Sequence, residues 1–71
     1  GLGKIADLES HLEKELARRG GFWALSDRSP ADQINRELGV SKKMFKKALG
    51  SLYKQRKITF EDDGIRWVDL K

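Results

Sequence analysis

Apolar residues recur along the first part of the chain at the spacing of an amphipathic helix. The stripe has four members, each three or four positions after the one before it: Ile5, Leu8, Leu12 and Leu16. We therefore predict a helix over residues 4–19, which the glycine pair at 20–21 ends. The next four residues, 22–25, are apolar and rich in aromatic side chains, and they are too few for a helix, so they predict a short strand.

Clear boundary signals delimit two further helices. Ser29 is a favourable N-cap and Pro30 suits the first position of a second helix. Gly39 ends that helix, because glycine enters the left-handed conformation at low cost. Ser41 follows at once and can cap a third helix, which we expect to run to about Lys57.

The C-terminal segment predicts a β-hairpin and completes the fold. Two apolar runs, 58–60 and 65–70, flank the acidic turn 61–64, whose Asp63-Gly64 pair is a strong hairpin signal. Two helices joined by a short Gly-containing turn form a helix-turn-helix, and a hairpin after the second one forms a wing. We predict an α+β winged helix-turn-helix over residues 4–71, with three helices and a small antiparallel sheet in the order α-β-α-α-β-β. Residues 1–3 are set aside as a linker or cloning remnant.

Length and composition narrow the classes of function. A chain of 71 residues allows one domain, which buries about 60% of its unfolded surface and holds no deep catalytic cleft. There is no cysteine and only one histidine, and no catalytic triad or glycine-rich phosphate loop is visible. We therefore expect no enzyme, no cofactor, no metal and no small-molecule substrate. No apolar run approaches the about 18 residues of a membrane helix and no signal peptide is visible, so we expect a cytoplasmic protein with no membrane partner.

Positive charge is concentrated on the predicted third helix. The chain has 15 Lys and Arg against 11 Asp and Glu, a formal net charge of +4. Residues 41–57 hold seven of these cations and no acid, so acids outnumber cations in the rest of the chain. At about 100° per residue, most of the cations fall on the arc opposite the apolar residues. The candidate nucleic-acid-binding set consists of these cations and a tyrosine at the border of the two faces: Lys42, Lys43, Lys46, Lys47, Lys54, Arg56, Lys57 and Tyr53.

Some residues of this helix depart from what helix stability favours. Lys42 and Lys43 lie in the first turn, where the helix dipole disfavours each cation by about 0.3–1 kcal/mol. Gly50, among the lysines, either lets a phosphate backbone or a partner approach or relieves crowding against a neighbouring element. Tyr53 either stacks on a base or packs on the hairpin. Local rules broken on one face favour a functional role for that face.

The predicted wing carries the opposite charge. Glu61, Asp62 and Asp63 would be repelled by phosphates, whereas DNA-binding winged helices often place Arg or Lys on the wing. We therefore expect the wing tip to face away from nucleic acid or toward a basic partner surface.

Three stretches, 22–30, 37–50 and 52–58, resemble the C-terminal winged-helix domain of the bacterial conserved virulence factor B family. The most specific piece is Ser-Lys-Lys-Met-Phe-Lys-Lys-Ala at 41–48, ahead of Leu-Tyr-Lys-Gln-Arg-Lys-Ile at 52–58, within a similarity that spans about residues 20–66. Proteins of that family resemble strings of OB-fold RNA-binding domains that end in one winged helix. The resemblance implies RNA binding, a role in virulence regulation, a cytoplasmic location and preceding OB-fold domains in the same parent chain. It carries over the seven cations of the candidate set.

We therefore expect a module that binds nucleic acid, RNA rather than DNA, by contacting phosphates through the lysine-rich face of the third helix. Two alternatives stay open. One is a DNA-binding transcription regulator with the same helix in a major groove. The other is a protein-interaction module whose basic helix docks on an acidic surface.

Overall fold

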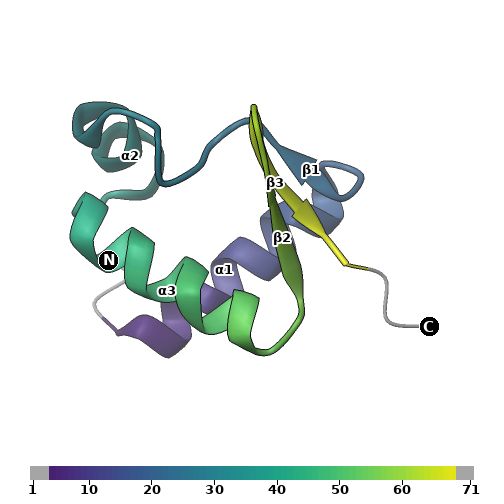
Figure 1. Cartoon of the computed structure of the whole chain (residues 1–71). Coiled ribbons are helices and arrows are strands. Elements are labelled where there is room, and N and C mark those ends of the chain that lie inside the picture. The colour runs from purple at the N-terminus through teal and green to yellow at the C-terminus, as the bar shows by residue number, and fades with distance from the viewer. Residues whose placement is uncertain (1–3, 69–71) are drawn as a thin grey trace.

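Three helices and three short strands make up residues 4–68, the part of the chain that the computed structural model describes (Figure 1). Their bounds are α1 (Ile5–Arg18), β1 (Phe22–Trp23), α2 (Ala31–Leu38), α3 (Lys42–Lys54), β2 (Ile58–Glu61) and β3 (Gly64–Trp67). This order confirms the predicted α+β winged helix-turn-helix. The expected linker at 1–3 and the end of the last apolar run, 69–70, lie outside the described residues.

The sheet is antiparallel with the strand order β1-β3-β2, so the two-residue β1 completes a sheet begun by the hairpin. The predicted hairpin is confirmed, but its turn consists of Asp62 and Asp63, because Glu61 pairs with Gly64. Gly64 is not part of the turn but the first residue of β3, and a Cβ at this position would overlap the carbonyl oxygen of Trp23. Only glycine lets β1 approach β3 this closely.

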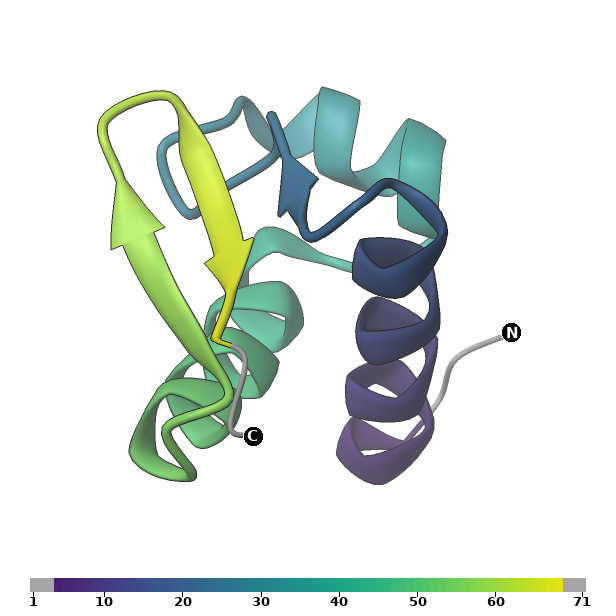
Figure 2. The same ribbon diagram turned by 90° about the vertical axis from the view of Figure 1, so that its right-hand side faces the viewer.

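The core lies where α1, α3 and the sheet meet, and Figure 2 shows α1 and the hairpin on opposite sides of it with α2 across the top. The predicted stripe of α1 contributes three fully buried leucines, and Phe45 and Leu49 enter from α3. The sheet adds Ile58 and Ile65. The buried hydrophobic residues form a single cluster: Leu8, Leu12, Leu16, Trp23, Leu25, Ile34, Leu38, Val40, Phe45, Ala48, Leu49, Leu52, Ile58 and Ile65.

The helix-turn-helix boundaries agree with the sequence signals at two residues and differ at a third. Gly39 ends α2 with φ 72°, and the Ser41 hydroxyl accepts a hydrogen bond from the Met44 N–H at 3.2 Å. The expectation that Ser29 caps α2 is wrong, since Pro30 occupies the N-cap position. The Ser29 hydroxyl instead accepts a bond from the Ser26 N–H at 3.0 Å, which tightens the preceding loop.

Candidate nucleic-acid interface

Helix α3 has one buried and one cationic face. Its apolar residues Phe45, Ala48, Leu49 and Leu52 are buried, whereas Lys43, Lys46, Lys47 and Lys54 are exposed and Lys42 is half-buried. None of these five lysines has a carboxylate within ion-pair distance among residues 4–68. We call the exposed side of α3 that carries them the basic face. Its charge is uncompensated within the described chain, so it attracts anions from outside.

The first turn of α3 contains Lys42 and Lys43 and no acid, as the sequence indicated. The Ser41 hydroxyl satisfies one of the free N–H groups there, so the helix start is formed by the cap rather than by charge. The two lysines add positive charge at the end where the helix dipole is already positive. Both effects strengthen the positive potential at this end of the basic face.

Gly50 lies on α3 with an open space beside it. A Cβ built on this residue would meet no atom within 4 Å outside its own helix backbone. The alternative that Gly50 relieves crowding against a neighbouring element is therefore wrong. The missing side chain leaves the helix backbone open to an approach from outside.

The basic helix ends three residues earlier than we expected, at Lys54. Arg56 follows in the left-handed conformation, with φ 61°, and its side chain is exposed. Lys57 turns toward α1, where its Nζ lies 3.4 Å from Glu13 Oε2. The structure thus brings five lysines and Arg56 together around the exposed side of α3, and it gives Lys57 an intramolecular carboxylate partner.

Tyr53 packs on the hairpin and still exposes much of its ring. Its centroid lies 5.2 Å from that of Phe60 in β2, with an angle of 41° between the ring planes. The side chain nevertheless remains 53% exposed, so the contact with the hairpin does not exclude stacking on a base. Phe60 is absent from the candidate set, and strand alternation gives no sign of its exposure, since it puts Phe60 on the same face as the buried Ile58.

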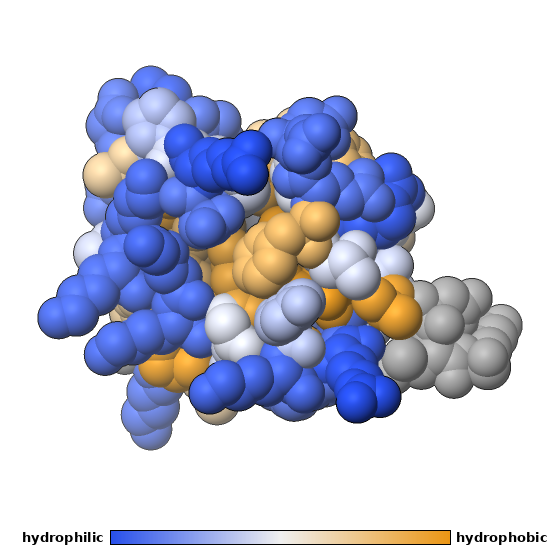
Figure 3. Space-filling model, viewed as in Figure 1, coloured by the Kyte–Doolittle hydropathy of each residue, from blue (hydrophilic) through white to orange (hydrophobic). Residues whose placement is uncertain are grey.

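A hollow of about 450 Å³ lies beside Tyr53, the residue whose ring contacts Phe60. Its walls come from the last turn of α3, the connection to β2, the start of β2 and the residue after β3: Tyr53, Lys54, Arg56, Ile58, Thr59 and Val68. In the space-filling view, an apolar patch occupies the middle of this face and hydrophilic side chains surround it (Figure 3).

The wing is acidic and only partly neutralised. Arg66 Nε donates to Glu61 Oε2 at 2.7 Å, and this bond raises the pKa of the Arg66 guanidinium. Asp62 and Asp63 are exposed at the turn, which lies at the end of the hairpin remote from the α3–β2 connection (Figures 1 and 2). The negative charge of the tip is thus separated from the end of the basic face.

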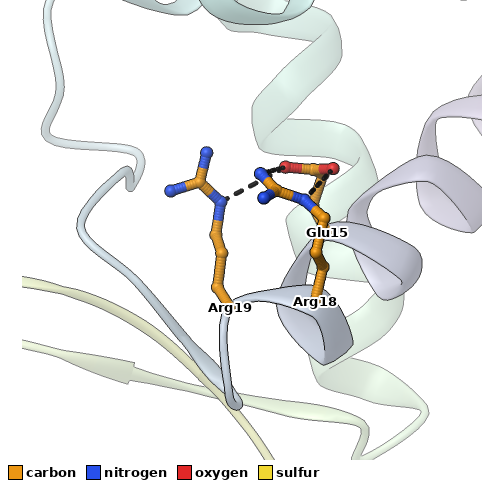
Figure 4. Close-up of polar contacts among 3 residues, drawn as sticks. All are labelled: Glu15, Arg18 and Arg19. Carbon is orange, nitrogen blue, oxygen red and sulfur yellow. Dashed lines mark hydrogen bonds and ion pairs between the residues drawn. The ribbon is translucent and has the colours of Figure 1, made fainter.

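At the end of α1, one carboxylate neutralises two arginines. Glu15 accepts hydrogen bonds from Arg18 at 2.8 Å and from Arg19 at 3.2 Å (Figure 4). The bonds from Arg18, opposed by partial desolvation, lower the pKa of Glu15 from 4.5 to about 2. These arginines are committed to a carboxylate of their own helix, unlike the lysines of α3.

Residues 4–68 contain neither a metal-binding cluster nor a membrane-spanning helix. No group of three or more His, Cys, Asp or Glu side chains is arranged there to hold a metal ion. None of the helices in that range has both the length and the apolar character that crossing a bilayer requires.

Comparison with known proteins agrees with the resemblance seen in the sequence. The model of a family described as "CvfB-like winged helix domain" matches residues 10–67. Among solved structures, a multidomain protein with nucleic acid binding domains from Streptococcus pneumoniae TIGR4 is similar, with 35% sequence identity and a TM-score of 0.83. The match covers 96% of this chain but only 23% of that protein. No curated protein gives a significant match.

Proposed function

The chain belongs to the family of CvfB-like winged helix domains, and on that premise we propose that it is a nucleic-acid-binding module whose ligand is RNA. The module contacts phosphates through the basic face of α3. Its parent is a larger bacterial regulator of the cytoplasm, in which OB-fold RNA-binding domains precede this one and which acts in virulence regulation. The similar streptococcal protein, described as carrying nucleic acid binding domains and about four times as long as the match, supports this setting.

The observation that carries the proposal is the set of unpaired lysines on one side of α3. Lysine contacts to phosphate give affinity with little sequence information, so the module holds the strand rather than identifying it. Four acids of the same fold are paired or remote: Glu13 and Glu15 pair with Lys57 and with two arginines, and Asp62 and Asp63 occupy the wing tip. A phosphate backbone that follows α3 therefore meets the unpaired lysines and no acid of that helix.

The acidic wing favours RNA over a DNA duplex. A duplex that receives α3 in its major groove is wide enough for the wing to meet its backbone as well. Asp62 and Asp63 would then face phosphates and weaken binding. A single strand of RNA can follow the basic face without reaching the wing tip.

The test replaces Lys43, Lys46 and Lys47 together by Gln and measures binding to a short labelled RNA by fluorescence anisotropy at several salt concentrations. If about four phosphates are neutralised at about −0.7 each, the wild-type slope of log K against log salt is about −3. A threefold rise in salt then costs roughly thirtyfold in affinity. The triple variant should flatten the slope by about two units and keep the fold, since all three side chains are exposed.

A matched control removes the same charge from α1 and its C-cap by replacing Lys14, Arg18 and Arg19 with Gln. This variant should keep the wild-type slope, and circular dichroism establishes that both variants fold. A folded Lys43, Lys46 and Lys47 variant with wild-type affinity and slope contradicts the proposal. Tighter binding to duplex DNA than to RNA favours the transcription regulator, and the absence of binding to either favours docking on an acidic protein surface.

A further inference from the structure

Two aromatic rings remain exposed on a small domain, although its core has few apolar residues to draw on. Among the described residues, Tyr53 and Phe60 are the large hydrophobic side chains left exposed, at 53% and 43%. They come from different elements, α3 and β2, yet their rings lie 5.2 Å apart. Burying an aromatic side chain is a main source of stability in a small domain. Two aromatic rings that are exposed next to each other therefore indicate contact with a ligand.

The hollow beside the rings has the composition of a site for a flat, anionic ligand. Ile58, 1% exposed, and Val68 supply apolar walls, while Lys54 and Arg56 supply cations. Thr59 completes the β2 part of the wall. Its volume of about 450 Å³ falls within the range of about 300–1,000 Å³ that is typical of small-ligand sites.

The backbone conformation of Arg56 also favours a binding site at the hollow. Arg56 has φ 61°, a left-handed conformation that favours glycine, and it is the one such non-glycine among residues 4–68. A glycine at this position would remove the strain and also the cation next to the hollow. Strain kept at an exposed charged residue is typical of binding sites.

We propose that Tyr53, Phe60 and the adjoining hollow form a subsite for one unpaired base of a single-stranded RNA, with Lys54 and Arg56 holding the neighbouring phosphates. This inference rests on the proposed function and names the strandedness of its ligand. An unpaired base offers its flat face to an aromatic ring, whereas the bases of a duplex are stacked on one another. Lys54 follows Tyr53 directly, so the subsite continues the path of a backbone that lies along the basic face.

The test removes the rings and keeps the charges. Tyr53 and Phe60 are replaced by Leu, singly and together, and binding is measured to a labelled oligouridine of about ten nucleotides, within the usual range of site sizes for single strands. Base stacking on an aromatic side chain is worth about 1–3 kcal/mol, so the double variant should lose roughly fivefold or more in affinity. Its salt slope should stay unchanged, because the slope counts phosphates and not bases.

Three further ligands and one control variant sharpen this test. An abasic oligomer with the same phosphates should bind wild type and double variant equally, as should an RNA duplex of the same length. Binding of an oligodeoxyuridine of the same length should be weakened in the double variant as binding of the RNA is, since this DNA offers the same bases. Phe22→Leu removes a half-buried ring of β1 that lies over Arg66 instead, and it should leave the affinity unchanged.

The remaining outcomes distinguish failure of the subsite from failure of the proposed function. A folded double variant with wild-type affinity for oligouridine overturns the subsite, even where the lysine variant weakens binding and the proposed function stands. Equal losses on the abasic and the base-bearing strand also overturn it, and indicate that the rings contact another apolar group. A wild type that binds no RNA overturns both.

A second measurement uses wild-type protein alone and does not depend on the folding of any variant. A 2-aminopurine placed within the oligouridine should lose fluorescence on saturation with protein, because stacking on a ring quenches it. Unchanged or increased fluorescence contradicts the subsite.

Discussion

Helices α1 and α3 pack against each other and have almost the same length, 14 and 13 residues, but their outer sides follow opposite rules. α1 is arranged for stability. It has Asp7 in its first turn and Arg18 in its last turn, and Glu15 forms ion pairs with Arg18 and with Arg19, the C-cap residue. The charges of its outer side therefore stabilise the helix that carries them.

α3 departs from the same rules at its start and in its middle. Its first turn holds Lys42 and Lys43 without an acid, and Gly50 occupies a position where alanine would fit. Its buried stripe is nevertheless as apolar as that of α1. The two helices serve the core equally, and the difference is confined to the side that faces solvent. Stability is thus given up on the surface for which we propose a ligand.

The C-terminal ends of the two helices make the comparison sharper, because both form the same Schellman turn. In each turn, the residue after the C-cap donates its N–H three residues back and the following residue donates five residues back. The distances are 3.3 and 2.7 Å in α1 and 2.9 and 3.0 Å in α3. The left-handed position is Gly20 in α1 and Arg56 in α3.

The largest expected effect on stability comes from exchanging these two residues. Gly20→Arg should lower the free energy of unfolding by about 1–2 kcal/mol, because a Cβ there meets no neighbour within 4 Å and only the left-handed backbone opposes it. Arg56→Gly should raise it by up to about 1 kcal/mol, the backbone strain removed less the entropy that glycine adds to the unfolded chain. Urea unfolding at neutral pH measures both.

The same exchange separates stability from binding. Arg56→Gly should weaken RNA binding and flatten the salt slope by about 0.7, the contribution of one phosphate contact. Gly20→Arg should leave the slope of the folded protein unchanged. If the Arg56→Gly variant is more stable than wild type and binds RNA equally well, Arg56 has no part in the interface. Its left-handed conformation is then not maintained for binding.

A smaller effect is expected from Gly50→Ala. Alanine should raise the free energy of unfolding by up to about 1 kcal/mol, since the site has room for the methyl group and glycine is the weaker helix former. The affinity for RNA should fall if a phosphate backbone approaches the helix there. Thermal unfolding and fluorescence anisotropy measure the two quantities, and a variant that is both more stable and equally tight in binding contradicts a close approach at Gly50.

The fold was predictable because its boundaries have local chemical signals. The leucine stripe of α1, the left-handed Gly39 and the Ser41 cap each depend on residues close together in the chain. Ser29 misled for a local reason, since its hydroxyl can cap a helix or close a turn, and it does the latter. The role of Gly64 depends instead on contact with Trp23, a strand partner far away in the sequence.

The candidate site was predictable only as far as it follows helix periodicity. The exposed lysines of α3 lie where about 100° per residue puts them. The sequence does not indicate that α3 ends at Lys54, because the left-handed residue after the helix is Arg56 and not the glycine that usually marks such a turn. The exposure of Phe60 and its contact with Tyr53 arise from the way β2 packs on the end of α3. Alternation along a strand does not contain that information.

The smallest expected effect concerns the charges of α1. Glu15 has a pKa of about 2 in the folded protein against the usual 4.5, so between these two values the unfolded chain binds more protons than the folded one. The stability that Glu15 contributes is therefore complete above about pH 4.5 and is lost as the pH falls toward 2. Glu15→Gln should lower the Tm slightly at pH 7, and the gap to wild type should close at pH 2. Added salt should narrow the gap at pH 7, because exposed ion pairs are weak and screened. If the difference in Tm between wild type and variant stays constant from pH 7 to pH 2, the ion pairs of Figure 4 are not its cause. That result would also remove one basis for the contrast between the paired arginines at the end of α1 and the unpaired lysines of α3.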